Sequence, residues 1–156
     1  MLNKWIWSNS DYETMSWHDN FVHAISYDPE KYSFELDIDH ICEWIDPRNE
    51  NGNFAFALAP ATLIFENASD LDIDIKIGSV VDFSIHEIKR EIVENKFRPD
   101  IPIFKFTIVM DHLGRIELNA TDYKMYVRKK PIESDTLWFT KEKRGGISLE
   151  RRIPET

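Results

Sequence analysis

The sequence alternates apolar and charged residues most strictly in the stretch Leu71-Asp72-Ile73-Asp74-Ile75-Lys76-Ile77. Successive side chains of a β-strand point to opposite faces of a sheet, so this pattern predicts a strand with one buried and one solvated face. The same period of two recurs in residues 34–39, 104–110, 116–120 and 123–127. We therefore expect a protein built mainly from β-strands.

Turn-forming residues separate these predicted strands. Asp28-Pro29-Glu30-Lys31 lies between the alternating residues 21–27 and 34–39, which predicts a hairpin, with Pro29 favouring the turn. Residues 46–53 are polar and rich in turn formers, which indicates a loop.

The segment 80–93 permits two interpretations. Its first half alternates like a strand, whereas Ile85, Ile88 and Ile92 recur at helical spacing, and we favour a strand that runs into a helical turn. With this segment the chain holds about eight or nine short strands in one domain, residues 1–140. We expect a mainly β fold, or α+β with one short helix, arranged as an antiparallel sandwich or rolled sheet.

Charge is unevenly distributed along the chain. The formal net charge is -9, and residues 1–122 hold 23 acidic and 10 basic residues, whereas residues 123–156 hold five and nine. An acidic body repels nucleic-acid phosphates and attracts basic proteins, so we expect a protein partner with a basic surface and no nucleic acid. Residues 141–156, with Gly145-Gly146 and many charges, predict a basic, mobile C-terminal tail.

Composition points to the cytoplasm. Cys42 is the single cysteine, so no intramolecular disulfide is expected and a reducing compartment fits. We expect no signal peptide and no membrane partner, because every apolar stretch is short. The chain has five glycines and no Gly-rich strand-to-helix turn, a pattern that argues against a nucleotide-dependent enzyme. Neither composition nor pattern predicts the oligomeric state.

Two acidic rows are the sharpest candidate site. Glu35, Asp37 and Asp39 share one strand face, and Asp72 and Asp74 share another, because residues two apart point the same way. If the two strands are neighbours, the five carboxylates form one exposed acidic patch suited to a basic partner or a divalent cation. The alternative is two ordinary solvated faces balanced by lysine and arginine on adjacent strands.

A second candidate is a metal site made of His18, Asp19, Asp37, Asp39 and His40, residue types that ligate metals or transfer protons. The alternative is a buried histidine satisfied by a backbone group and an aspartate that caps a turn. Apart from such a divalent metal ion, no cofactor is expected.

Three tryptophans, Trp5, Trp7 and Trp17, precede the first clear strand. Large aromatic side chains usually bury most of their area, so we expect a lid over one end of the core. If they are exposed, they become anchors for a partner protein instead.

Four stretches within residues 15–130 carry a resemblance. They are Met15-Ser16-Trp17-His18-Asp19, Leu36-Asp37-Ile38-Asp39-His40-Ile41 followed by Trp44, Ala59-Pro60-Ala61-Thr62-Leu63-Ile64-Phe65-Glu66 running into Asp70-Leu71, and Gly114-Arg115-Ile116-Glu117-Leu118. With these stretches the chain resembles a family of small bacterial proteins of unknown function, and some of the pattern is similar to immunity proteins of bacterial toxin systems. The family itself implies no activity, cofactor or catalytic residue.

The leading hypothesis is therefore a non-enzymatic acidic binding protein, such as a toxin-immunity protein that recognises a basic protein partner. The alternative is a metal-binding protein or metal-dependent hydrolase that uses the His/Asp set named above.

Overall fold

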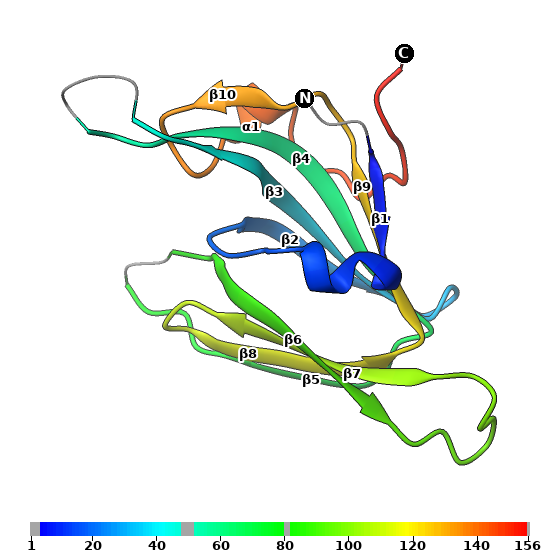
Figure 1. Ribbon diagram of the computed structural model, residues 1–156. Helices are drawn as coiled ribbons and strands as arrows, with labels where there is room; N and C mark the ends of the chain where they lie inside the picture. Colours follow the sequence, from blue (N-terminus) through cyan, green and yellow to red (C-terminus); the bar gives the residue numbers. More distant parts are fainter. Residues whose placement is uncertain (1–3, 48–51, 80–81, 156) are drawn as a thin grey trace.

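The computed structural model describes residues 4–47, 52–79 and 82–155, which form two antiparallel β-sheets packed as a sandwich (Figure 1). The six-stranded sheet has the order β1-β9-β4-β3-β2, with β10 also paired to β4, and the four-stranded sheet has the order β5-β8-β7-β6. The strands are β1 (Ile6–Ser8), β2 (Phe21–Asp28), β3 (Ser33–Ile45), β4 (Ala55–Glu66), β5 (Ser69–Ile75), β6 (Ile85–Val93), β7 (Ile103–Met110), β8 (Gly114–Ala120), β9 (Asp122–Val127) and β10 (Ile132–Ser134).

The predicted mainly β, antiparallel fold is confirmed, with ten strands among the described residues in place of eight or nine. Two helices accompany them: a 3-10 helix, η1 (Asn9–Thr14), and the single-turn α1 (Lys141–Arg144). In the described part of the chain, no helix has the length and apolar composition needed to cross a membrane.

The main core lies between the two sheets. Leu36 and Ile38 from β3 face Phe106, Ile108 and Ile116 from the four-stranded sheet, and all five side chains are fully buried. These are the apolar members of the alternating segments. Burying each such side chain stabilises the fold by roughly 1.5–3 kcal/mol, which is why the period of two predicts both the strands and their inner faces.

The predicted hairpin of residues 21–39 is present as β2 and β3. The side chain of Asp28 accepts hydrogen bonds from the backbone N–H groups of Glu30 (2.9 Å) and Lys31 (3.3 Å), which closes the turn.

The described part of segment 80–93 contains no helical turn, since residues 85–93 are a strand throughout. A β-bulge between Ile85 and Glu87 inserts one residue, so Ile85 and Ile88 both point into the core although they are three apart. The bulge thus produces the helix-like spacing. Residues 80 and 81 lie outside the described residues.

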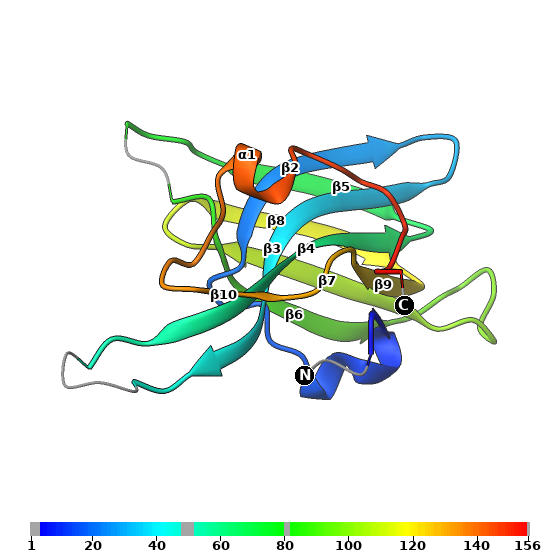
Figure 2. The same cartoon turned by 90° about the horizontal axis from the view of Figure 1, so that it is seen from above.

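The segment predicted to be a mobile tail instead crosses the outer face of the six-stranded sheet (Figure 2). The Thr62 hydroxyl on β4 donates to the Glu150 carbonyl at 2.8 Å, and Arg144 is only 3% exposed. Just before α1, Phe139 packs into a second, smaller core formed with Ile41, Phe56 and Leu58. We call residues 135–155 the C-terminal strap.

Candidate functional site

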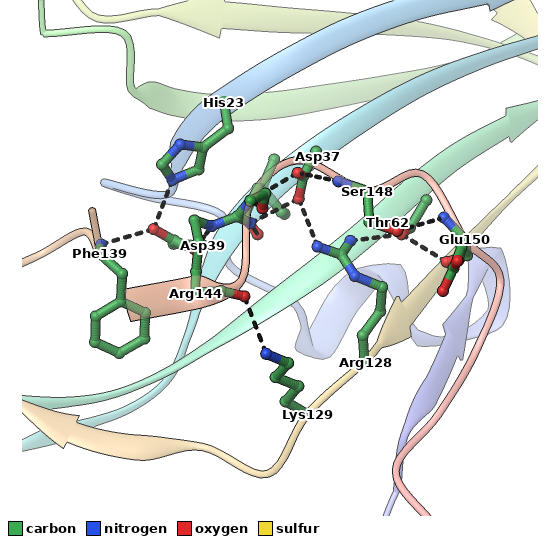
Figure 3. A network of polar contacts seen from close by, with 12 residues as sticks. His23, Asp37, Asp39, Thr62, Arg128, Lys129, Phe139, Arg144, Ser148 and Glu150 are labelled. Atoms are coloured by element: carbon green, nitrogen blue, oxygen red, sulfur yellow. Dashed lines mark hydrogen bonds and ion pairs between the residues drawn. The ribbon is translucent and has the colours of Figure 1, made fainter. Parts of the chain in front are cut away.

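A buried ion-pair network fastens the strap to β3 (Figure 3). The Arg144 guanidinium donates to Asp37 through both terminal nitrogens, at 2.7 and 2.6 Å, and to Asp39 through Nε at 3.0 Å. Arg128, directly after β9, donates at 2.9 Å to Asp37 Oδ1, which also accepts from Arg144. Neither carboxylate is exposed to solvent, so each depends on these donors in place of water.

Backbone groups and one histidine complete the network. The N–H of Ser148 donates to Asp37, and the N–H of Phe139 donates to Asp39, at 2.9 and 2.8 Å. His23 lies 2.7 Å from the second oxygen of Asp39. Since the strap supplies an arginine and two backbone donors, the two aspartates act as its docking point.

The pKa values of the central pair reflect this arrangement. Burial would raise the pKa of Asp37, but hydrogen bonds from Arg144, Ser148 and Arg128 outweigh it and hold the pKa below its ordinary value. Burial would likewise lower the pKa of Arg144, yet the hydrogen bonds that it donates to Asp37 and the charge of Asp39 raise it. Both groups therefore stay ionised.

The expectation of one exposed patch made of Glu35, Asp37, Asp39, Asp72 and Asp74 is wrong. The first three lie on β3 under the strap, are at most 7% exposed, and have arginine partners from the same chain. Asp72 and Asp74 lie on β5 in the other sheet and are exposed. The period of two assigned the faces correctly, but it could not show that one polar face is covered.

The set His18, Asp19, Asp37, Asp39 and His40 is not brought together either. His40 points to the inner side of β3, where its Nδ1 lies 2.7 Å from the Asn20 side-chain oxygen, whereas Asp37 and Asp39 point outward. His18 lies beside Asp19 at 3.4 Å, about half exposed. Within residues 4–47, 52–79 and 82–155, no group of three or more His, Cys, Asp or Glu side chains is arranged to hold a metal ion.

The early tryptophans pack against the core, in agreement with the lid interpretation. Trp17 is 3% exposed and meets the Tyr123 ring edge-to-face at 5.3 Å, and Trp5 and Trp7 cover the neighbouring core residues. Trp17 is therefore not free to anchor a partner, and Trp5 and Trp7 are partly buried against the core.

The outer face of the four-stranded sheet is the acidic surface that remains open to solvent. Cross-strand partners point to the same side, and Asp72 pairs with Glu117, which in turn pairs with Thr107. Among the described residues of this sheet, six carboxylates and three cations share that side. We call them the acidic face: Asp70, Asp72 and Asp74 on β5, Glu87 and Glu91 on β6, Glu117 on β8, with Lys89, Lys105 and Arg115 between them.

The cations of the acidic face pair with its carboxylates in exposed positions. Arg115 Nε donates a short hydrogen bond to Glu117, which holds the pKa of that carboxyl below its ordinary value, and the other contacts are longer. Lys105 lies 3.7 Å from Glu91 and 3.6 Å from Glu117, and Arg115 lies 3.9 Å from Asp74. In the part of the chain that the structure describes, the Asp72 side chain has no hydrogen bond or ion pair, and its charge acts on Arg115 only from a greater distance. Exposed pairs of this kind contribute about 0–1 kcal/mol each, so a partner's cations can displace them at little cost.

Sequence reasoning missed Arg128 and Arg144 in the network, and Glu87, Glu91 and Glu117 on the acidic face. For the arginines a signal existed, because a row of three acidic residues on a strand needs cations nearby and the excess of basic residues lies in residues 123–156. For the glutamates the signal was their alternation with buried residues, but the order of the strands was needed to place them beside Asp72 and Asp74.

Comparisons of the chain with protein-family models, curated proteins and solved structures found no match. The resemblance to small bacterial proteins and to immunity proteins therefore remains a prediction from the sequence stretches alone.

Proposed function

We propose that this protein is a non-enzymatic binding protein whose acidic face recognises a basic surface on another protein. The observation that carries the proposal is the excess of carboxylates on one uncovered side of a paired sheet, where Asp74 and Glu91 have side chains 77% and 69% exposed. Such a surface steers a cationic partner and speeds its association without a deep cleft.

The two outer faces of the sandwich differ in a way that supports this choice. On the outer face of the six-stranded sheet, Asp37 and Asp39 form ion pairs with Arg144 of the same chain. Their carboxylates are therefore not available to a partner. On the four-stranded sheet, β5 pairs with β8 and β6 pairs with β7, so the backbone of the strands that carry the carboxylates is held in a fixed arrangement. A preorganised array loses little conformational entropy on binding.

The similarity to immunity proteins adds a partner class to the proposal. A protein that neutralises a toxin must bind it directly, and a toxin domain with a basic surface would fit the acidic face by charge. The cytoplasm, expected from the single cysteine, is the compartment in which we propose that this binding occurs.

Neutralising the acidic face should weaken binding of a basic probe about tenfold. The variant is Asp72→Asn, Asp74→Asn and Glu117→Gln together, and the loss corresponds to roughly 0.5 kcal/mol for each exposed charge removed. The measurement is the fluorescence anisotropy of a labelled nona-arginine peptide in 20 and 150 mM salt. The effect should shrink at the higher salt, because ions screen exposed charges.

The matched control removes the same number of charges from exposed positions outside the sheet: Glu30→Gln, Asp46→Asn and Asp135→Asn. The affinity of this control variant for the nona-arginine peptide should fall less than threefold. Equal losses in the two triple variants would show that only net charge matters, and the proposed function would then be abandoned.

A further inference from the structure

Strand β5 lies at one edge of the four-stranded sheet. Within the described residues, β5 pairs with β8 on one side and with no strand on the other. At its start the edge is closed, because the Ala68 N–H donates to the Tyr32 carbonyl at 2.7 Å. From Leu71 onward it is open.

The backbone register shows which groups face this free edge. The N–H of Lys76 donates to Leu113 at 2.9 Å, so Lys76 is bonded toward β8, and Asp74 two residues earlier has the same orientation. Gly114 lies so close to the Asp74 carbonyl that a Cβ has no room there, as expected for a carbonyl directed at β8. The alternate residues Ile73 and Ile75 therefore direct their N–H and C=O groups away from β8, toward the open side.

Apolar side chains are left half covered on the inner side of the same edge. Ile73 is 46% exposed, and Ile77, just beyond the strand, is 62% exposed. Figures 1 and 2 place β2 above β5 on this side of the sandwich, and two β2 side chains directed inward, Ile25 and Tyr27, are 37% and 44% exposed. An added strand next to β5 would cover Ile73 and narrow the opening between the sheets.

The charge on β5 decides what kind of strand fits. Its outer side carries Asp72 and Asp74, and before them Asp70 lies in a β-bulge, where its carboxylate accepts a hydrogen bond from the Asn119 side chain at 3.1 Å. If two copies of β5 paired antiparallel with their apolar residues inward and Asp72 opposite Asp72, Asp70 would lie opposite Asp74, and like charges directly opposite destabilise a sheet. A strand with lysine or arginine at those positions would form favourable cross-strand pairs instead.

We infer that the free edge of β5 receives an extended segment of the basic partner as an added strand, in which basic and apolar residues alternate. The inference rests on the proposed function and gives its binding mode. Backbone hydrogen bonds to Ile73 and Ile75 supply the pairing, the aspartate row selects the basic residues, and Ile73 selects the apolar ones.

The test compares two nine-residue peptides of equal composition, one in which arginine and valine alternate and one in which the arginines precede the valines. The alternating peptide should bind about tenfold more tightly. In hydrogen exchange followed by NMR, it should slow exchange of the Ile73 and Ile75 amides, which the block peptide leaves unchanged.

The matched variant is Ile73→Pro, which removes an edge N–H and no charge, and proline is tolerated where the N–H of an edge strand faces solvent. It should abolish the advantage of the alternating peptide and leave nona-arginine binding unchanged. Should it fail to fold, Ile73→Lys keeps the backbone donor but places a cation against the added strand, and should also remove the advantage.

Equal binding of the two peptides with no protection of Ile73 and Ile75 would overturn the added strand. If nona-arginine binding remained sensitive to the triple variant Asp72→Asn, Asp74→Asn and Glu117→Gln in that case, the proposed function would stand without it. If nona-arginine binding were unaffected by the triple variant, both the added strand and the proposed function would be rejected.

Discussion

Replacing Arg144 by alanine should destabilise the folded protein by about 3–5 kcal/mol, the usual cost of removing one partner from a buried ion pair. The substitution leaves Asp37 and Asp39 without the donor that contacts both, and neither carboxylate can reach water where it lies. The free energy of unfolding, measured by urea denaturation at pH 7, tests this expectation.

Arg152→Ala is the control, because Arg152 lies on the same strap but pairs with Glu150 at 3.2 Å in an exposed position. It should cost less than about 1 kcal/mol. The loss of stability in Arg144→Lys should fall between those of the two alanine variants, since lysine keeps the charge but cannot make the bidentate contact with Asp37. A loss for Arg144→Ala no greater than that for Arg152→Ala would contradict the assignment of Arg144 as the anchor of the strap.

Acidification from pH 7 to pH 4 should destabilise the protein by about 3 kcal/mol through His40 alone. Burial lowers the pKa of His40 from 6.5 to about 4, because the imidazolium form cannot be solvated inside the sandwich. Between these two values the unfolded chain binds a proton that the folded chain does not, so stability is complete above pH 6.5 and falls with pH down to about 4. Urea unfolding at intervals of half a pH unit measures the slope.

His40→Asn should flatten this slope, because no group with a displaced pKa remains at the position. His112→Asn is the matched control: His112 is exposed, and asparagine tolerates its positive φ of 56°. The control should keep the wild-type slope. An unchanged slope in His40→Asn would show that another group is responsible for the pH dependence.

Protonation of Asp37 should cause a second decrease in the free energy of unfolding, at lower pH. Its pKa in the folded protein is below the ordinary value of 3.8, so its contribution is complete above that pH and is lost as the pH falls through the folded value. The pH range of the Asp37 effect therefore lies below that of the His40 effect, so the loss of unfolding free energy between pH 6.5 and about 4 reports on His40.

The strands and their inner faces could be read from the sequence. In residues 34–39, alternation correctly separates Leu36 and Ile38, which are fully buried, from the polar residues on the outer side. In residues 71–77 it correctly predicts a strand, but β5 ends at Ile75 and Ile73 on its apolar side is still 46% exposed. The interpretation of Ile85 and Ile88 as helical spacing was wrong because a bulge is a local shift that the composition of a short segment does not reveal.

For the candidate site, too, the sequence predicted one part correctly and the other part wrongly. Asp72 and Asp74 lie on a solvated face as the pattern predicts, whereas Asp37 and Asp39 lie beneath a strap that contributes Arg144, 107 residues after Asp37. Alternation is a local property: it says that one side of a strand is polar and does not say whether water or another segment meets that side.

By itself, then, the sequence determined that the chain forms antiparallel strands with an apolar inner side, because burial of every second side chain imposes a period of two. Only the tertiary structure decided which strands are neighbours, which acidic row is neutralised by the chain's own arginines, and which row is left facing solvent beside an open edge. The physical reason is that contacts between distant segments depend on how the whole chain packs, and no short stretch of sequence contains that information.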